Sequence, residues 1–362
     1  MSQHVLTVVV VGVGHMGASH ALAYTNIPGY KVIGFVVASN VSRAEKIAAD
    51  LGLSVPVYTD FYQAINELKP DVVSINTHPD THARYAIYAM EHGCHVFVEK
   101  PIALTALEAE SVADVAKKTG RVLLVGYILR VHPAWQKFIQ LARGLGKPSV
   151  MRLNLNQQSS GQDWQKQKSS ISVIPPIVSC GVHYVDVMCQ ITDAKPIMVQ
   201  SIAARLSGEI GEGTCNYWAM HIAFDDGSVG WFEVGWGPMI SNVASSVKDV
   251  SGPKGSVSFS RTNSNANPSD ITLHASVGAI VLHSSTLDRN NSFAMDDKIF
   301  TIEDEPDHDA LCKLEQECLY AAINENVDLG GQLDSAVSSL KICLAAVESY
   351  QTGKAVKTGR LR

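Results

Sequence analysis

Residues 5–17 read V-L-T-V-V-V-V-G-V-G-H-M-G, a nearly continuous apolar run followed by the pattern G-x-G-x-x-G. Such a run is typical of a strand that is buried on both faces of a parallel sheet. In a dinucleotide site, the first glycine permits a tight turn, the second lets the backbone approach a pyrophosphate, and the third lets helix and strand pack closely. Free N–H groups at the start of the following helix then bind the phosphates. The pattern therefore predicts a dinucleotide site formed by Gly12, Gly14, His15, Met16 and Gly17, and the alternative is a turn without a ligand.

Strand and helix patterns alternate outward from this loop through the first 126 residues. We expect strands at 5–11, 31–37, 71–76, 95–98 and 121–125, and helices at 18–25, 42–51 and 81–92. A further helix begins at a capping box of Thr105 and Glu108 and stops before Gly120. Repetition of strand, helix and strand implies right-handed crossovers, so the sequence predicts an α/β fold with a doubly wound parallel sheet.

The pattern changes after about residue 130. We expect a helix at 132–143, a strand at 149–156, a polar loop at 159–172 and a helix at 178–191. Strands at 199–206, 218–224, 229–234, 256–260 and 279–283 alternate with turn signals at 226–227, 253–255 and 263–270, which indicates one large, mainly antiparallel sheet. Helices are expected at 309–324 and 333–350. The sequence thus predicts two domains, at 1–127 and 128–362.

The composition excludes several classes of protein. The 362 residues are 46% hydrophobic and 18% charged, with a net charge of −6, which argues against disorder and against a nucleic-acid partner. The longest apolar runs have the length of strands, and the N-terminus does not resemble a signal peptide. Seven cysteines form no C-x-x-C pair, so we expect reduced, mostly buried thiols in a cytoplasmic protein.

The end of the second strand bears on the choice of dinucleotide. NAD sites usually carry an acidic residue there, whereas residues 36–43 read V-V-A-S-N-V-S-R, with no acidic residue before Glu45. Ser39 and Asn40 can donate hydrogen bonds, and Arg43 can pair with a 2′-phosphate. This favours NADP over NAD, and the alternative is that Arg43 is a solvated residue of a first helical turn.

Further motifs point to one family. They are N-T-H-P-D-T-H at 76–82, E-K-P at 99–101, G-Y-x-x-R at 126–130 and G-V-H-Y-V-D at 181–186. With the glycine loop, they resemble the Gfo/Idh/MocA oxidoreductases, which include glucose–fructose oxidoreductase and inositol dehydrogenases, over essentially the whole chain. The resemblance implies a Rossmann domain at 1–127 and, at 128–362, a substrate-binding α/β domain whose open sheet commonly forms homodimers or homotetramers. It also implies hydride transfer between nicotinamide and a carbon of a sugar, polyol or inositol.

By position, Lys100 matches the catalytic lysine of that family and His183 its catalytic histidine. Lys100 follows the carboxyl end of a strand, where open α/β sheets bind ligands. An ammonium there can stabilise negative charge that develops on a substrate oxygen. His183 would remove the hydroxyl proton during oxidation and return it during reduction.

The chain departs from the family at Ser179. Most relatives carry Asp at this position, four residues before the histidine, where it could orient the imidazole or act on the same oxygen. A hydroxyl carries no charge, so His183 lacks that anionic partner. Either His183 and Lys100 suffice, which we favour, or Asp186 or Asp163 has taken over, or the chain is weakened or repurposed.

Other residues are assigned to the site by their position near these motifs. His15 and His20 are expected to be cofactor-adjacent or structural. His78 and His82 have the spacing of metal ligands, but Pro79 lies between them and no third ligand is near, so no metal is expected. The remaining cofactor-binding residues are expected to be Thr77, His78, His82, Glu99, Lys100 and Tyr127, and the substrate-binding residues Lys100, Arg130, Asp163, Trp164 and His183. His132, Tyr184 and Trp236 are further candidates for the pocket, with ordinary packing as the alternative for each aromatic residue.

Two other functions stay open. The first is a redox-neutral glycoside-cleaving enzyme of the same superfamily, which oxidises the sugar transiently and then returns the hydride. The second is a non-catalytic regulator that senses the cofactor. The intact residues Lys100 and His183 argue against a regulator, and Ser179 argues slightly for one.

Overall fold

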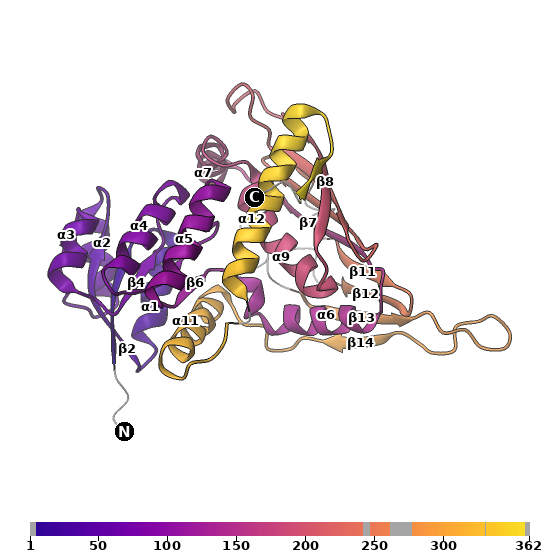
Figure 1. Ribbon diagram of the computed structural model, residues 1–362, viewed down its shortest axis with the longest axis horizontal. Coiled ribbons are helices and arrows are strands. Elements are labelled where there is room, and N and C mark those ends of the chain that lie inside the picture. The colour runs from indigo at the N-terminus through magenta and orange to yellow at the C-terminus, as the bar shows by residue number, and fades with distance from the viewer. Residues whose placement is uncertain (1–4, 242–246, 261–276, 330, 359–362) are drawn as a thin grey trace. The chain divides into compact units, whose positions relative to one another are not determined.

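The computed structural model describes residues 5–241, 247–260, 277–329 and 331–358, and these form two compact units (Figure 1). The first unit comprises Met1–Val131 and Pro306–Ser338, and the second comprises His132–Glu305 and Ser339–Arg362. The chain first passes from one unit to the other after Val131, close to the expected boundary at 127/128. Residues 306–338, however, were expected in the second domain and are part of the first unit. The turn expected at 263–270 lies outside the described residues.

The first unit contains a six-stranded sheet with the order β3-β2-β1-β4-β5-β6, in which every neighbouring pair is parallel. The strand order reverses between β1 and β4, and ligands of open α/β sheets bind at such a point, outside the carboxyl ends of the strands. The doubly wound sheet predicted from the sequence is therefore confirmed. The strands are β1 (Leu6–Val11), β2 (Tyr30–Val36), β3 (Val57–Tyr58), β4 (Val72–Ile75), β5 (His95–Val98) and β6 (Leu123–Val125).

Helices connect these strands. The capping box at Thr105 and Glu108 is present, and Gly120 ends the same helix in a left-handed conformation, as expected. Two elements were not predicted from the sequence: β3, which has only two residues, and α3, which the side chain of Asp60 caps. The helical elements are α1 (His15–Thr25), α2 (Val41–Asp50), α3 (Phe61–Leu68), α4 (Pro79–Glu91), α5 (Ala106–Thr119) and the short 3₁₀ helix η1 (Ile128–Arg130). Helices α4 and α5 lie side by side (Figure 1).

Helix α11 (His308–Asn324) packs on α1, although the two are nearly the whole chain apart. Tyr24 of α1 donates a hydrogen bond of 2.7 Å to the side chain of Gln316, and the Tyr30 hydroxyl donates one of 3.0 Å to the carbonyl of the same residue. Leu319 is fully buried in one core cluster with the strand residue Val8. The late helix therefore completes the core of the first unit.

The second unit contains a nine-stranded sheet with the order β14-β13-β12-β11-β7-β10-β9-β8-β15. The β7–β10 pair is parallel and the other pairs are antiparallel, so the sheet is mixed but mainly antiparallel. The strands are β7 (Val150–Gln157), β8 (Pro196–Ala204), β9 (Tyr217–Phe224), β10 (Val229–Trp236), β11 (Lys248–Gly252), β12 (Gly255–Ser260), β13 (Ala279–Ser284), β14 (Lys298–Thr301) and β15 (Val356–Lys357). The helices are α6 (Pro133–Gly144), α7 (Gly161–Ile171), α8 (Pro176–Ser179), α9 (Gly181–Thr192) and α12 (Gln332–Thr352), within which the division between the units falls.

Two expectations for the second unit were wrong. The segment 159–172, expected as a loop because of its polar residues, contains helix α7, which buries Trp164 and Ile171 on one side. The helix expected at 178–191 is two helices, α8 and α9, which meet at Cys180. Helix α7 is therefore held against the core by the two apolar residues that it buries, although most of its residues are polar.

The thiols agree with the sequence analysis. All seven cysteines are free, and five of them are buried. Within the described ranges, no helix is both long enough and apolar enough to span a bilayer.

The close packing at the third loop glycine generates a prediction. A Cβ at position 17 would lie 1.8 Å from the carbonyl oxygen of Gly12, whereas one at position 14 would meet no atom within 4 Å. We expect Gly17→Ala to lower the free energy of unfolding by about 3 kcal/mol or more, because neither backbone segment can move away. Gly14→Ala, the matched control, should cost about 1 kcal/mol or less. Urea unfolding of both variants makes the comparison, and equal losses would contradict the packing role of Gly17.

Candidate functional site

The glycine loop has the geometry that each of its glycines was expected to supply. Gly12 has a φ of +81°, which favours glycine, and the backbone of Gly12 contacts Gly17 so closely that no side chain fits there. Gly14 is exposed and precedes the first residue of α1, and the space beside its α-carbon is open. The first N–H groups of α1 have no partner within the helix. The loop therefore fits a dinucleotide pyrophosphate, with exposed His15 and half-buried Met16 beside it.

The segment after β2 presents its three candidate residues to solvent. Ser39, Asn40 and Arg43 are all exposed. The side-chain oxygen of Asn40 accepts a hydrogen bond of 3.1 Å from the N–H of Arg43, and so caps α2. Asn40 thus has its amide N–H groups left for a ligand, while the guanidinium of Arg43 extends from the first turn of the helix.

His82 joins the two segments that follow β4 and β5. It is buried, with Nδ1 2.8 Å from the carbonyl oxygen of Pro101 and Nε2 2.9 Å from that of Thr77. Burial lowers the pKa of His82, although hydrogen bonds to the two carbonyls act in the opposite direction. Its ring therefore orients the segment that carries Lys100. His78, at the start of α4, is exposed, and its ring lies 3.8 Å from the Asp80 carboxylate.

Glu99 and Lys100 lie at the carboxyl end of β5. The Glu99 side chain is buried, with one oxygen 3.0 Å from Nε2 of His20 and the other accepting a bond of 3.2 Å from the N–H of Lys100. Burial alone would raise the pKa of Glu99, but the hydrogen bond from His20 and the positive charge of Lys100 lower it to about 2. Lys100 is half-buried, and its peptide bond to Pro101 is cis. Lys100, the catalytic candidate, thus directly follows the ionised carboxylate of Glu99 in the sequence.

The contacts of His20 determine its tautomer. Its Nδ1 lies 3.0 Å from the amide nitrogen of Gln316, which can only donate, so Nδ1 accepts and Nε2 donates to Glu99. Gln316 in turn accepts from Tyr24. The structural role, one of the two considered for His20, accounts for these contacts, and a place beside the cofactor stays a prediction. Gln316 and Tyr24 were missed, because no local pattern connects them to a motif so far away in sequence.

Tyr127 and Arg130 complete the candidates of the first unit. Tyr127 is almost fully buried, and Arg130 is half-buried at the end of η1.

In the second unit, Ser179 and His183 belong to successive helices. Ser179 is the last residue of α8, His183 lies in the first turn of α9, and both are half-buried. The intervening Cys180 keeps a right-handed helical conformation, with φ −100° and ψ −35°. Asp186, considered as a substitute acid, is buried and accepts a bond of 2.8 Å from Gln190 one turn later.

The aromatic candidates of the second unit are packed in its interior. Trp164 is 4% exposed and donates to Glu209 at 3.3 Å. Tyr184 is stacked on Phe232, with ring centroids 4.8 Å apart. Asp163 pairs with Lys166 on the surface of α7 at 2.9 Å. Packing, the alternative considered for these rings, accounts for Trp164 and Tyr184.

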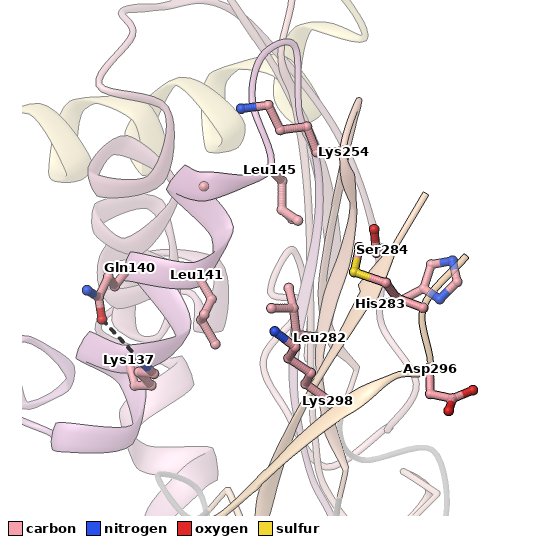
Figure 2. Close-up of a pocket in the computed structure, with 12 residues that line it drawn as sticks. Lys137, Gln140, Leu141, Leu145, Lys254, Leu282, His283, Ser284, Asp296 and Lys298 are labelled. Atoms are coloured by element: carbon pink, nitrogen blue, oxygen red, sulfur yellow. Dashed lines mark hydrogen bonds between the residues drawn. The ribbon is translucent and has the colours of Figure 1, made fainter. Parts of the chain in front are cut away.

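A cavity of about 370 Å³ in the second unit lies between α6 and the sheet. Figure 2 shows Leu141 of α6 and Leu282 of β13 in the space between them, with Lys298 directed into it and His283 directed away. His283 lies 2.7 Å from the Asp297 carboxylate. None of the lining residues was a candidate for the functional site.

Comparison with known proteins identifies the family. The model of an oxidoreductase family with an NAD-binding Rossmann fold matches residues 6–127, and the model of that family's C-terminal alpha/beta domain matches residues 140–358. The chain belongs to the Gfo/Idh/MocA oxidoreductase family. The resemblance seen in the sequence motifs is therefore confirmed.

Curated members of the Gfo/Idh/MocA family match part of the chain. UDP-N-acetylglucosamine 3-dehydrogenase of Acidithiobacillus ferrooxidans is 32% identical over 193 residues, which are 53% of this chain and 56% of that protein. The scyllo-inositol 2-dehydrogenase (NAD(+)) of Bacillus subtilis is 28% identical over 234 residues, 63% of this chain and 66% of that protein. The chain thus spans between half and two thirds of the length of these relatives. A structure of scyllo-inositol dehydrogenase from Lactobacillus casei with NAD(H) and scyllo-inositol has the same fold, with a TM-score of 0.76 at 18% identity over 98% of this chain and 99% of that one.

The buried carboxylate generates a prediction for stability. The pKa of Glu99 falls from 4.5 to about 2 on folding, so Glu99 stabilises the fold above pH 4.5, and this contribution is lost as the pH falls toward 2. We expect Glu99→Gln to lower the free energy of unfolding at pH 7 by on the order of 3 kcal/mol, and the difference to shrink below pH 4.5. Urea unfolding at a series of pH values measures it, with exposed Glu91→Gln as the control. A difference independent of pH would contradict the assignment.

Proposed function

We propose that this protein is an NAD(P)-dependent dehydrogenase that transfers a hydride between nicotinamide and a carbon of a sugar, polyol or inositol. The observation that supports this most is the placement of Lys100, which follows β5 at the carboxyl edge of a dinucleotide-binding sheet. The curated relatives are named as sugar and inositol dehydrogenases, which is consistent with this substrate class.

Two side chains share the proposed chemistry: Lys100 acts as a cation and His183 as a base. Bound nicotinamide would supply the acceptor or donor of the hydride. Lys100 would hold the reacting oxygen of the substrate and stabilise the negative charge that grows on it as the hydroxyl becomes a carbonyl. His183 would take the hydroxyl proton in that direction and return it in the other.

Lys100 needs a fixed backbone for this role. Its N–H donates to Glu99, and the next residue's carbonyl is held by His82. The contact of His82 is buried and that of the Lys100 N–H is partly buried. The main chain on either side of Lys100 is therefore anchored.

For the cofactor, we propose NADP in preference to NAD. The support is the exposed Arg43 in the first turn of α2, together with the absence of an acidic residue at the end of β2. An exposed guanidinium can pair with the 2′-phosphate that NAD lacks. The cytoplasmic location expected from the sequence stays a prediction.

We also propose that the protein forms a homodimer or homotetramer through the sheet of the second unit. Ile197, Met198 and Ile202 of β8 are 48%, 39% and 66% exposed. Apolar side chains grouped on one strand in this way are common where subunits meet.

The function is tested by following nicotinamide absorbance with a panel of polyols, sugars and glycosides, using NAD and NADP in parallel. We expect a net change with at least one polyol or sugar, and we expect Lys100→Met to lower kcat roughly 100- to 1,000-fold, because the cation acts on charge that develops during the reaction. Exposed Lys117→Met is the control. Full activity of Lys100→Met would exclude its assignment, and glycoside cleavage without net absorbance change would favour the redox-neutral enzyme.

The serine that replaces the usual acid is tested by Ser179→Asp. If the new carboxylate acts on His183, it will favour the charged imidazole, and the acidic limb of the pH–rate profile will move upward by about one unit. Steady-state kinetics from pH 5 to 9 would show the shift, with Ser179→Asn as the uncharged control. A profile that matches the unchanged protein at every pH would mean that position 179 has no part in catalysis.

A further inference from the structure

Three side chains that can ligate a metal meet inside the first unit, where α11 packs on α1. His20 comes from α1, while Cys312 and Glu315 are three residues apart on α11 and so share one face of it. One donor atom from each lies within 4.8 Å of the donors of the other two. His20 and Cys312 are fully buried, and Glu315 is 3% exposed. The proposed reaction uses neither Cys312 nor Glu315.

Glu315 is the group that requires an explanation. Its Oε1 is buried and has no hydrogen-bond partner within the described residues. A buried acceptor without a partner costs about 1–3 kcal/mol, and an ionised one costs more. An unpartnered buried oxygen that lies close to a thiol and an imidazole is placed as a cation ligand would be.

His20 is already oriented as a metal ligand. Its Nδ1 faces α11, where it accepts from Gln316, and its Nε2–H donates to the Glu99 carboxylate at 3.0 Å. Histidines that bind metals almost always donate their other ring N–H to a carboxylate or a carbonyl, which fixes the tautomer and makes the ligand more basic. Gln316 can give up Nδ1 to a metal and still accept from Tyr24.

We propose that Nδ1 of His20, Sγ of Cys312 and the carboxylate of Glu315 form a binding site for a divalent cation of the zinc type. One thiolate, one imidazole and one carboxylate are a donor set that Zn²⁺ accepts in tetrahedral geometry.

The site departs from the expectation of no metal, which rested on ligand spacing along the sequence. His20 and the α11 residues become neighbours only through the fold. Binding would cross-link α1 to α11 and stabilise the first unit in proportion to the occupancy of the site.

Cobalt is the probe of choice, because thiolate-bound Co²⁺ has a near-ultraviolet charge-transfer band. The full-length protein is treated with a chelator, dialysed and titrated with Co²⁺ alone. We expect one equivalent to bind with that band and to raise Tm, and Zn²⁺ to displace it. Cys312→Ser should abolish the band, and Glu315→Gln should weaken binding roughly 10-fold or more. Cys318→Ser, on the same helix but exposed, should behave as the unchanged protein.

Two results would overturn the proposal: no stoichiometric binding by the unchanged protein, or a band that survives Cys312→Ser. Should the variants fail to fold, X-ray absorption of the zinc-loaded unchanged protein identifies the atoms bound to the metal. One sulfur ligand together with nitrogen and oxygen ligands is expected. Any other set of ligands contradicts the site. The readouts are spectral and thermal, so they do not depend on the proposed dehydrogenase activity.

Discussion

The candidate site of the first unit depends on keeping one carboxylate ionised inside the protein. Glu99 is 7% exposed, and an unpaired charge in such surroundings would take up a proton rather than stay ionised. The hydrogen bond from His20 and the nearby positive charge reverse that tendency. Because it stays ionised, Glu99 can accept hydrogen bonds from the main chain of Lys100 and from the imidazole of His20.

This arrangement draws on residues from distant parts of the chain. Successive hydrogen bonds connect them: Tyr24 donates to Gln316, Gln316 donates to His20, and His20 donates to Glu99. Because every member is buried, loss of one hydrogen bond would leave another polar group without a partner. The network therefore links the end of β5 to the packing of α11 on α1. The position of the backbone at Glu99 and Lys100 thus depends on how α11 packs.

The sequence predicted what local patterns determine. The run before Gly12, the capping box at Thr105 and the alternation of strands and helices each reflect a physical rule that operates over a few residues, and the doubly wound sheet follows from them. The motifs around Gly12 and Lys100 likewise located the loop and the edge of the sheet. Where a side chain's environment comes from remote segments, local patterns carry little information.

His20 and α7 show this limit. A histidine three residues after the last loop glycine has no visible partner in the sequence, since Glu99 and Gln316 are brought to it only by the fold. Helix α7 was expected as a loop, because its polar residues outnumber the two that it buries. Trp164 was expected to bind the substrate, which stays a prediction, and its buried ring packs that helix against the second unit.

The return of α11 to the first unit has a consequence for how the protein forms. The first unit is discontinuous in sequence, and the larger part of the second unit, His132–Glu305, is synthesised between its two parts. A nascent chain that has completed β6 still exposes the face of α1 that Gln316 and Leu319 will cover. The dinucleotide-binding unit therefore cannot reach its final packing until synthesis is nearly over, so its two segments must find each other across an intervening domain.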